Sequence, residues 1–574
     1  MITRGQNTKP YPLNIVGSSN FGRYNKISAE RTYNMFMSDS FMIPYAGYYP
    51  VINQSVFNSG KSGRGAYNSI KFNRLVLVID SNVWFVNISY DTATNNYIYA
   101  PPVLIGQLNT STGVVYIVEN NKPQLVISDN TMLYIYDPAI NSSLQPYNYF
   151  NGGQVLSFIP GYITFHDNYI LVAASNDIAV VNAPANNTWR LSAINDATTF
   201  PNDSSSIGLL QTKPDNTQAV VRFPSKGNMI FVMGRNVTEA WFDTGAQLFP
   251  YQRNNQFNID YGCLNPATVA YMDELVVWLA ANERSGAVIM YSNGGMPKPI
   301  STDGIDYLFS LLTTPQDSQA FLYRQDGHVF YHINFYTDNL SLMYDFNTQK
   351  IYNACDQNLN YFIAAEVAYF NNQYYFVSKN TGNLYAFDTT YYTYSDTDAN
   401  NNVVINEIPR FRICGHIRTP DQDYGIINDI GFTIETGETD YQQQSIGPIY
   451  LITQDSRQIV TQGDVGFFVT QDNNFIITQN GEYLVSQQPG FIVDNLIAQQ
   501  SAILYITPRV DLSMSYDGGA SFGNEQPYVL NPIGKRRNRL MWWQQGINND
   551  AVPMFKFWGV GRVVCTDGMV HVRY

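Results

Sequence analysis

The sequence offers few side chains whose types and spacing could carry out chemistry. His328 and His332 are four residues apart, which on a β-strand places both imidazoles on one face, about two pleats from each other. Imidazoles in this arrangement bind Zn²⁺ when cysteines or carboxylates complete the ligand set. No cysteine or carboxylate cluster accompanies the pair, and His166, His416 and His571 are scattered. We therefore expect no metal site and no cofactor.

The motifs of common enzyme classes are also missing. The sequence contains no G-x-S-x-G elbow, no phosphate-binding glycine loop before a helix and no H-E-x-x-H. The segment from Ser515 to Phe522 resembles the Asp-box turn of sialidase-like propellers, where the box is a structural hairpin. A sialidase repeats this box and adds an arginine cluster, whereas here it occurs once. We predict that the protein is not an enzyme, and the alternative is a carbohydrate-binding or glycan-cleaving β-propeller, such as a receptor-binding phage protein.

One dense basic run lies near the C-terminus and is followed by two tryptophans. It is either a strand that lines a subunit contact, with the tryptophans buried, or a patch that touches DNA, with aromatic rings available for stacking. We favour the subunit contact. The run consists of Lys535, Arg536, Arg537 and Arg539, and the tryptophans are Trp542 and Trp543.

The overall charge argues against a protein that grips nucleic acid. The 33 lysines and arginines face 46 aspartates and glutamates, which gives a formal charge of -13. Tight binding to phosphates needs a basic face. An acidic protein can still surround DNA without adhering to it, because like charges repel.

The elements that must position these residues are β-strands. Seven pairs of apolar strands, each joined by a turn rich in Asn, Asp or Gly, recur about every 45 to 60 residues, as expected for hairpins in propeller blades. One hairpin cannot bury its own apolar face, but a ring of hairpins can. We predict an all-β fold with a seven-bladed β-propeller. The pairs are 75–78 with 83–86, 125–127 with 133–135, 169–173 with 178–181, 229–233 with 237–242, 275–279 with 288–290, 329–333 with 340–344, and 374–377 with 384–387.

The chain divides into three parts by composition. Residues 1–60 are rich in Asn, Ser, Tyr and Gly and are expected to form an irregular N-terminal arm. Residues 61–417 hold the propeller, and residues 418–574 form a C-terminal β-sandwich-like domain, with strands expected at 430–435, 512–516, 555–558 and 569–572. The four cysteines are far apart without C-x-x-C spacing, so we interpret them as reduced core residues.

A second, shorter repeat lies inside the C-terminal domain, at about residues 442–501. Pairs of apolar residues followed by Thr-Gln or Ser-Gln recur every eight or nine residues, which predicts a stack of short strands inserted into the domain. A Gln-rich disordered insert is the alternative. The repeats are 451–454, 459–462, 468–471, 476–479 and 484–487.

Several motifs, in this order, resemble the packaged-DNA stabilisation proteins of short-tailed bacteriophages, which are tail hub or nozzle proteins. Near the start, Ser28 to Phe36 is similar to the opening of that family. The strand Gly234 to Gly245, with its Thr-Glu-x-aromatic pattern, comes next. The remaining motifs are Tyr261-Gly262-Cys263, Val276 to Leu279, Pro299 to Ile305, Ser515 to Phe522, and Gly534 to Arg539 leading into Trp542.

The resemblance implies a structural role in the virion. It implies a homohexameric ring below the portal and its adaptor protein, which extends the DNA channel, retains packaged DNA and takes part in genome ejection. Expected partners are the portal adaptor, a tail needle or plug, a tail spike or fibre, and double-stranded DNA that passes without sequence-specific binding. The family has no catalytic residues. We expect a phage-tail location, synthesis in the host cytoplasm and no integral membrane segment, because the longest central apolar run, Leu275 to Ala281, is too short to span a bilayer.

Overall fold

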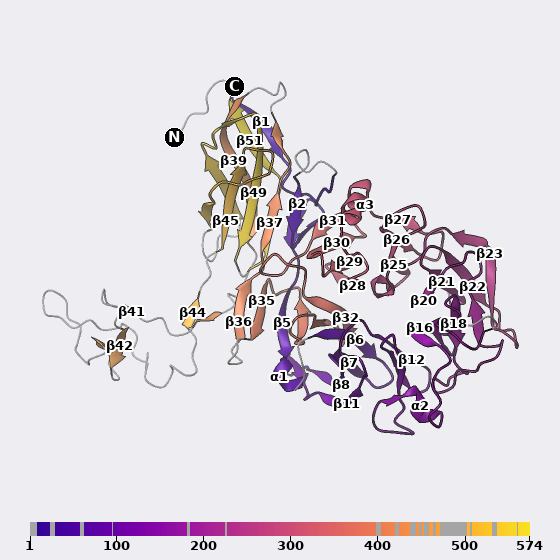
Figure 1. Ribbon diagram of the computed structural model, residues 1–574. Helices are drawn as coiled ribbons and strands as arrows, with labels where there is room; N and C mark the ends of the chain where they lie inside the picture. Colours follow the sequence, from indigo (N-terminus) through magenta and orange to yellow (C-terminus); the bar gives the residue numbers. More distant parts are fainter. Residues whose placement is uncertain are drawn as a thin grey trace.

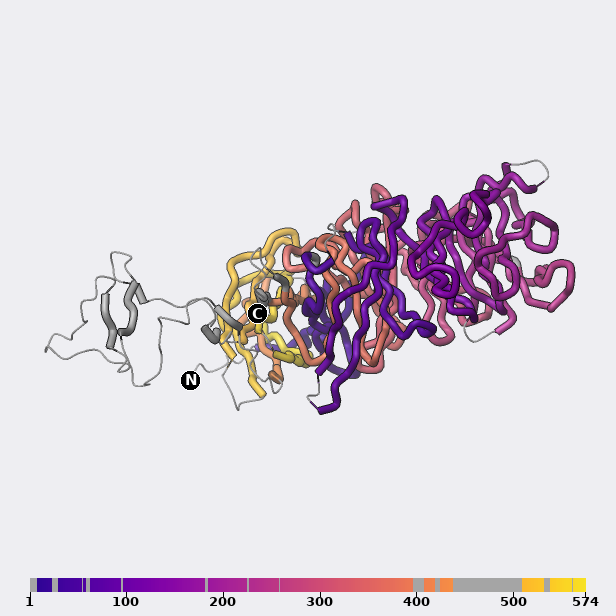
Figure 2. Tube along the Cα trace, turned by 90° about the horizontal axis from the view of Figure 1, so that it is seen from below, coloured from indigo at the N-terminus to yellow at the C-terminus, as the bar shows by residue number. Residues whose placement is uncertain are grey.

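The computed structural model describes most of the chain and shows an all-β protein, with 53% of residues in strands and 4% in helices. The described residues are 8–22, 29–57, 62–93, 96–180, 184–223, 227–397, 403–418, 424–436, 444–446, 451–452, 458–462, 467–470, 502–504, 508–530, 537–559 and 561–573. A ring of sheets lies beside a C-terminal β-region along the length of the molecule (Figures 1 and 2).

Six of the seven predicted hairpins are present as antiparallel strand pairs. Asp80, Asn130 and Asn339 adopt positive φ at or near their turns (48°, 64° and 52°), as this turn chemistry requires. The pairs are β7 (Arg74–Ile79) with β8 (Asn82–Val86), β13 (Leu125–Ser128) with β14 (Leu133–Tyr136), β21 (Met229–Gly234) with β22 (Thr238–Asp243), β25 (Leu275–Ala280) with β26 (Val288–Ser292), β29 (His328–Phe335) with β30 (Leu340–Asp345), and β33 (Gln373–Ser378) with β34 (Leu384–Asp388).

The third predicted hairpin is wrong in its second strand. β17 (Tyr169–Ser175) pairs with β18 (Thr188–Leu191), and Ile178, which was assigned to the partner strand, is 66% exposed. The chain makes a longer excursion because Asp177 exchanges two backbone hydrogen bonds with Ala185 and forms a fully buried ion pair with Arg190, 3.3 Å between Oδ2 and Nη1. The apolar residues after Asp177 have the composition of a strand, but the buried Asp177–Arg190 pair determines the course of the backbone here.

Each hairpin gains an inner and an outer strand, and the resulting sheets form a β-propeller of at least six blades (Figure 1). Five four-stranded sheets stand alone, and two further four-strand units belong to larger sheets. The inner strands are β6 (Gly63–Ser69), β12 (Tyr116–Glu119), β16 (Ile159–His166), β20 (Thr217–Arg222), β24 (Ala270–Met272), β28 (Ser318–Gln325) and β32 (Ala364–Phe370). The outer strands are β11 (Val103–Gln107), β15 (Gln145–Pro146), β19 (Ile207–Leu209), β23 (Tyr251–Ile259), β27 (Lys298–Pro299), β31 (Lys350–Asn353) and β5 (Gly47–Ile52).

Helices contribute little to the described part of the chain. They are α1 (Gln54–Phe57), α2 (Tyr147–Phe150) and α3 (Asp303–Ser310), together with one 3₁₀ turn at Pro266–Thr268. Helix α3 buries Ile305 and Phe309 in a cluster with residues of two blades, that of β25 and that of β29. The helices therefore fill space at the rim of the propeller and do not form a layer.

The N-terminal segment, expected to be irregular, forms strands instead. β1 (Thr8–Leu13) pairs with the C-terminal strand β51 (Gly568–Arg573), and β5 completes the sheet of β32, β33 and β34. β3 (Met35–Ser38) and β4 (Phe41–Pro44) form a hairpin that reaches β50 (Val563–Cys565). Local pattern analysis does not reveal β1 and β5, because their partners lie hundreds of residues away, whereas β3 and β4 form a local hairpin that it missed.

The short strand β2 (Arg31–Tyr33) joins the propeller to the C-terminal region. It lies parallel to β31 on one side and antiparallel to β37 (Arg410–Ile413) on the other. A single sheet therefore runs from the inner strand β28, through β2 and β37, to β49 (Asp550–Trp558), β45 (Arg509–Ser515) and β46 (Gln526–Val529).

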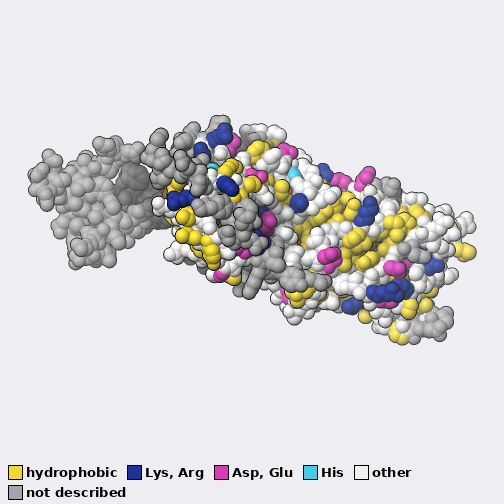
Figure 3. Space-filling model, turned by 90° about the horizontal axis from the view of Figure 1, so that it is seen from above, with side chains coloured by type: hydrophobic (Ala, Val, Ile, Leu, Met, Phe, Trp, Pro, Cys, Tyr) yellow, Lys and Arg dark blue, Asp and Glu magenta, His cyan; other side chains and the backbone are white. Residues whose placement is uncertain are grey.

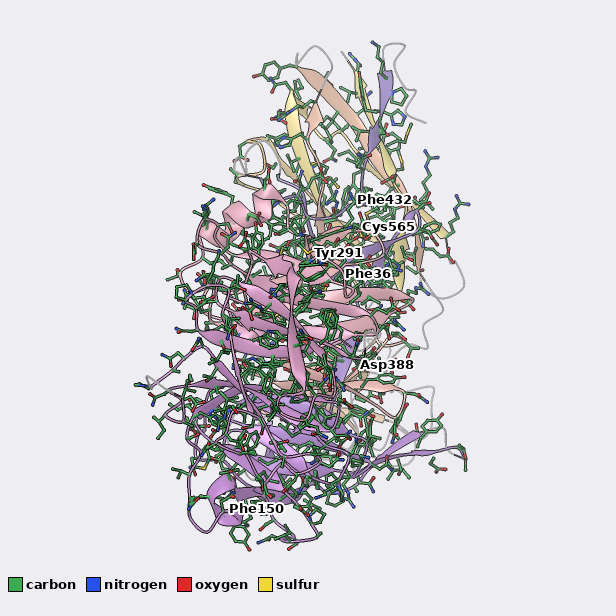
Figure 4. All side chains as sticks on the ribbon, turned by 90° about the vertical axis from the view of Figure 1, so that its right-hand side faces the viewer. Phe36, Phe150, Tyr291, Asp388, Phe432 and Cys565 are labelled. Carbon is green, nitrogen blue, oxygen red and sulfur yellow. The ribbon has the colours of Figure 1, made fainter. Side chains whose placement is uncertain are left out.

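Two sheets meet in the C-terminal region. The second sheet orders β1, β51, β39 (Gly425–Thr436), β50, β4 and β3, and β47 (Arg537–Trp543) pairs with β39. The strands predicted at 430–435, 512–516, 555–558 and 569–572 fall on β39, β45, β49 and β51. Phe432 and Cys565 belong to one buried cluster with Phe555 and Trp542, and Figure 4 places Phe36 below them, toward the propeller.

The first three Thr-Gln repeats coincide with three short strands. β41 (Leu451–Ile452), β42 (Gln458–Gln462) and β43 (Phe467–Thr470) pair as an antiparallel meander, and β40 (Gln444–Ile446) pairs with β44 (Ala502–Leu504). The repeats at 476–479 and 484–487 lie outside the described residues. The insertion therefore contains β-structure where it is described.

The four cysteines are all buried and unpaired, as interpreted from their spacing. Within the described residues, no helix is long and apolar enough to cross a membrane.

Arg412 on β37 holds the N-terminal segment against the body of the protein. Its side chain is fully buried and donates hydrogen bonds to the carbonyls of Ile15 (3.1 Å) and Ser18 (2.7 Å), and it pairs with the Glu30 carboxylate. The guanidinium sits so close to Gly17 that an added Cβ would lie 2.2 Å from Nη2. A buried charge with this many partners is costly to remove.

We predict that Arg412→Ala lowers the free energy of unfolding by about 3 kcal/mol, because several buried carbonyls lose their donor. Arg412→Lys keeps the charge but not the planar fork, so we expect about half that loss. Urea unfolding followed by tryptophan fluorescence measures both. Arg418→Ala is the control, because Arg418 makes an exposed pair with Asp550. Equal losses in Arg412→Ala and Arg418→Ala would contradict the assigned role.

Candidate binding sites

A cavity runs through the centre of the propeller. It has a volume of about 630 Å³ and is lined by residues of the inner strands β6, β12, β16, β20, β24, β28 and β32. Because inner strands of a propeller run side by side around the axis, the residues at their ends gather at the two mouths of the channel. The channel is lined by six tyrosines: Tyr67, Tyr116, Tyr162, Tyr271, Tyr369 and Tyr374.

Arg222 is the last residue of β20 and lies at one mouth of this channel. Its guanidinium carbon is 5.5 Å from the centre of the Tyr271 ring, and its Nη1 donates a long hydrogen bond (3.5 Å) to the Phe165 carbonyl. Its Nε is buried without a hydrogen-bond partner. In the described part of the chain, no carboxylate lies within ion-pairing distance of Arg222.

Glu119 lies near the same mouth, but its carboxylate is already satisfied. It accepts hydrogen bonds from Ser69 Oγ (2.6 Å) and from the backbone N–H of Ile70 (2.9 Å) and Lys71 (3.3 Å). Burial, followed by the charge of Glu119, raises the pKa of the Tyr67 hydroxyl, while Arg222 acts in the opposite direction. The phenol therefore stays neutral and can donate a hydrogen bond.

Glu366 is the carboxyl group on the opposite half of the channel wall. It follows a bulge in β32, and its Oε2 accepts a hydrogen bond from Gln319 Nε2 (3.2 Å). Gln319 in turn accepts from the Tyr336 hydroxyl at 3.2 Å. Burial raises the pKa of Glu366 to about 8, and the Gln319 hydrogen bond offsets this only in part. At pH 7 this side chain is mostly protonated and neutral.

We predict that Glu366→Gln stabilises the protein increasingly as the pH rises. An unfolded glutamate releases its proton near pH 4.3, whereas folded Glu366 retains it up to about pH 8, so wild-type stability falls between these values. Allowing for solvent at the channel wall, the variant should match wild type at pH 4 and exceed it by about 2 kcal/mol at pH 8. Urea midpoints across this pH range test this, with Glu274→Gln, an exposed position, as control. A constant difference at all pH values would refute it.

The histidines have structural partners rather than a common site. His328 Nδ1 lies 2.8 Å from Asp345 Oδ2 and His571 Nδ1 lies 2.6 Å from Asp429 Oδ1. His332 stacks on Phe321 with 4.7 Å between ring centres, and burial lowers its pKa to about 3. Among the described residues, no group of three or more His, Cys, Asp or Glu side chains gathers.

The Asp-box-like segment is a turn in which the Asp517 carboxylate accepts hydrogen bonds from the turn's own residues. Asp517 Oδ1 accepts hydrogen bonds from the backbone N–H of Ala520 (3.0 Å) and Ser521 (2.9 Å), and Oδ2 accepts from Ser521 Oγ (2.6 Å). The Ser515 hydroxyl also bonds Asp517, and these bonds hold the pKa of Asp517 well below its ordinary value. The segment fixes the loop between β45 and β46.

In β47, alternate side chains of the basic run and of the residues after it point to opposite faces of the sheet. Arg537 and Arg539 are exposed and oppose Glu435 and Thr433 of β39, whereas Trp542 is buried and donates its indole N–H to the Gln526 carbonyl at 3.0 Å. Trp543 is 46% exposed in the single chain, so its burial in a subunit contact stays a prediction. Lys535 and Arg536 lie outside the described residues.

One face of the molecule, seen in Figure 3, is not continuously basic. On the face seen in Figure 3, basic side chains are dispersed among hydrophobic, acidic and uncharged ones. Such a surface is suited to selective contacts with a protein and poorly suited to tight binding of a phosphate backbone.

Residues 96–392 match the family described as "Bacteriophage P22 Gp10, beta-propeller". This match spans more than half of the chain. The protein belongs to this phage stabilisation family. The matched range runs from β10 (Asn96–Tyr99) to just beyond β34, so it covers most of the propeller.

Family membership gives the protein a structural, DNA-stabilising role in a bacteriophage and therefore a place in the virion. It points to a non-enzymatic role. A search of curated proteins finds no match to the sequence.

Solved structures with low identity resemble this member of the stabilisation family in part. The N-terminal domain of Nup159 (9% identity, TM-score 0.37) covers 62% of this chain and 98% of its own. A catalytically inactive virginiamycin B lyase from Staphylococcus aureus with quinupristin (10% identity, TM-score 0.36) covers 59% of this chain and 98% of its own. BamB from Moraxella catarrhalis (8% identity, TM-score 0.35) covers 62% of this chain and 93% of its own. At these scores the similarities support no argument about function.

Sequence reasoning missed the channel residues of this phage protein. Arg222 ends the apolar strand T-Q-A-V-V-R, and Glu366 interrupts the apolar strand A-A-E-V-A-Y-F. A lone charge in an inner strand of a propeller is the signal that could have marked both.

Proposed function

We propose that the protein is the tail hub, or nozzle, of a short-tailed bacteriophage. In this role it forms a homohexameric ring that extends the DNA channel of the portal, retains the packaged DNA and takes part in genome ejection. The observation that carries the proposal is membership in the P22 Gp10 family. The partners are a portal adaptor, a tail needle or plug, a tail spike or fibre, and passing double-stranded DNA. The protein is made in the host cytoplasm and assembled into the phage tail.

The proposed architecture has three parts. Residues 1–60 are an N-terminal arm, residues 61–417 a seven-bladed propeller, and residues 418–574 a sandwich of two sheets with an insertion at about 442–501. The seventh blade is the unit of β32, β33 and β34, whose outer strand β5 comes from the N-terminal segment. Closing the last blade with a strand from the other end of the chain stabilises a ring of this kind.

The charge distribution supports a channel protein that does not retain DNA by adhesion. The net charge of -13 repels phosphates, and Arg537 lies opposite Glu435 on the adjacent strand. DNA passing such a surface meets few sites that slow it. Electron cryomicroscopy of a purified particle tests the proposal, since a ring of this chain below the portal is expected and its absence from the tail would refute the hub role.

We predict that Arg537→Gln with Arg539→Gln impairs assembly of the ring more than it affects DNA affinity. These side chains are exposed on a mixed face with Trp543, which fits a protein contact better than a phosphate track. Assembly onto particles that lack the protein is measured by sedimentation. Arg284→Gln with Lys298→Gln removes the same charge from exposed propeller positions and is the control. Tight duplex binding by the free protein at physiological salt, lost in the first variant alone, would favour a DNA patch instead.

We also predict that the insertion contacts an outer component of the tail. It leaves the body between β39 and β45, and an insertion is best tolerated where it leaves at the surface. Replacing residues 444–499 with a short Gly/Ser bridge should leave the propeller folded and weaken attachment of a spike or fibre. Circular dichroism and particle composition measure the two effects. Unfolding of the entire chain would show that the segment belongs to the core.

A further inference from the structure

The propeller channel has the features of a binding site that the tail role does not use. Its volume of about 630 Å³ is within the range of small-ligand sites. Its wall combines tyrosine rings, a half-buried guanidinium and a few amides and hydroxyls. This composition differs from the tightly packed apolar interior of the blades around it.

The charge of the cavity selects for an anion. Arg222 has no ion-pair partner among the described residues, and its Nε is buried without an acceptor. Lys71 lies at the same mouth, while Glu119 is already bound by Ser69 and by two backbone N–H groups. Glu366, on the opposite half, is held mostly neutral by burial at pH 7. A carboxylate in the channel would pair with the terminal Nη groups of the guanidinium, as arginine–carboxylate pairs do.

The tyrosines select for a ligand with flat apolar faces and hydroxyl groups. Tyr271 lies beside Arg222 and is 39% exposed, and Tyr369 on β32, which also lines the channel, is 48% exposed. Aromatic rings at this exposure pack against the C–H faces of sugar rings, while their hydroxyls and Asn68 can hydrogen-bond the sugar hydroxyls. A nucleic acid fits less well, because one arginine and one lysine cannot neutralise successive phosphates.

We propose that the propeller channel binds an acidic saccharide, with its carboxylate on Arg222 and a sugar ring against Tyr271. The mouth that holds Arg222 is where the charged sugar enters, and the remaining volume holds the adjoining sugar rings. This inference is independent of the ring assembly, since a monomeric chain already contains all of the residues involved.

Isothermal titration calorimetry and saturation-transfer NMR with the full chain test this. The probe is a tetrasaccharide of alternating glucuronic acid and N-acetylglucosamine, and the neutral reference is the tetrasaccharide of N-acetylglucosamine. We expect the acidic probe to bind at least ten-fold more tightly than the neutral one. Acetate and a four-nucleotide oligothymidylate are run beside them, to separate a bare carboxylate and a nucleic acid from a saccharide.

Three variants assign the contacts. Arg222→Gln should weaken the acidic probe at least ten-fold and leave the neutral one unchanged, and Arg222→Lys should restore part of the affinity. Tyr271→Leu should weaken both saccharides three-fold or more, because it removes the ring and leaves the charge. Arg284→Gln, on an exposed turn away from the channel, is the matched control and should change nothing. Unchanged melting temperatures confirm that the variants are folded.

The proposal is overturned by any of four results. These are the absence of saturable binding by the acidic tetrasaccharide, equal binding in Arg222→Gln, acetate affinity equal to that of the saccharide, and tighter binding of the oligothymidylate.

Discussion

The structure depends on the placement of the N-terminal segment between the propeller and the C-terminal region. β2 contributes only three residues, yet it supplies the hydrogen-bonded link between β31 and β37. Arg412 anchors the chain on one side of this strand, and Asn34 anchors the other by donating to the carbonyls of Cys355 (3.1 Å) and Pro409 (2.9 Å). Without this strand, the sheet that spans both regions would present two unpaired edges.

The alternation of side chains along β3 connects two hydrophobic cores. Met35 is fully buried in the cluster of the C-terminal region, whereas the next residue, Phe36, is fully buried in the aromatic cluster of the propeller with Phe330 and Tyr352. Successive side chains of a strand point to opposite faces, so one short strand can contribute to both. This shared strand couples the propeller to the C-terminal region.

Several buried or turn-forming carboxylates of the chain have hydrogen-bond partners within the protein itself. The carboxylates of Asp345, Asp429 and Asp517 are bound by a histidine, by a second histidine and by a turn, respectively. Arg222 is different, because its partners in the described structure are an aromatic ring and one distant carbonyl. A structural protein would be expected to satisfy such a group, and this contrast is why the channel stands out from the rest of the molecule.

The sequence by itself determined the class of fold and the local hairpins. Six of the seven hairpins were predictable, because alternating apolar residues and Asn or Asp turns act within a few residues of each other. The strands at 430–435 and 569–572 were predictable for the same reason. The order of short motifs was enough to indicate the phage family, since those motifs sit at fixed places along the chain.

Tertiary structure decided everything that depends on distant partners. The buried Asp177–Arg190 pair redirected the third hairpin, and strands β1, β2 and β5 pair with the distant strands β51, β37 and β34. The pleat of β47 exposed Trp543 while burying Trp542. The channel that joins Arg222 to Tyr271 exists only when the inner strands close into a ring. Local pattern cannot report such contacts, because their energy comes from residues that are neighbours in space and not along the chain.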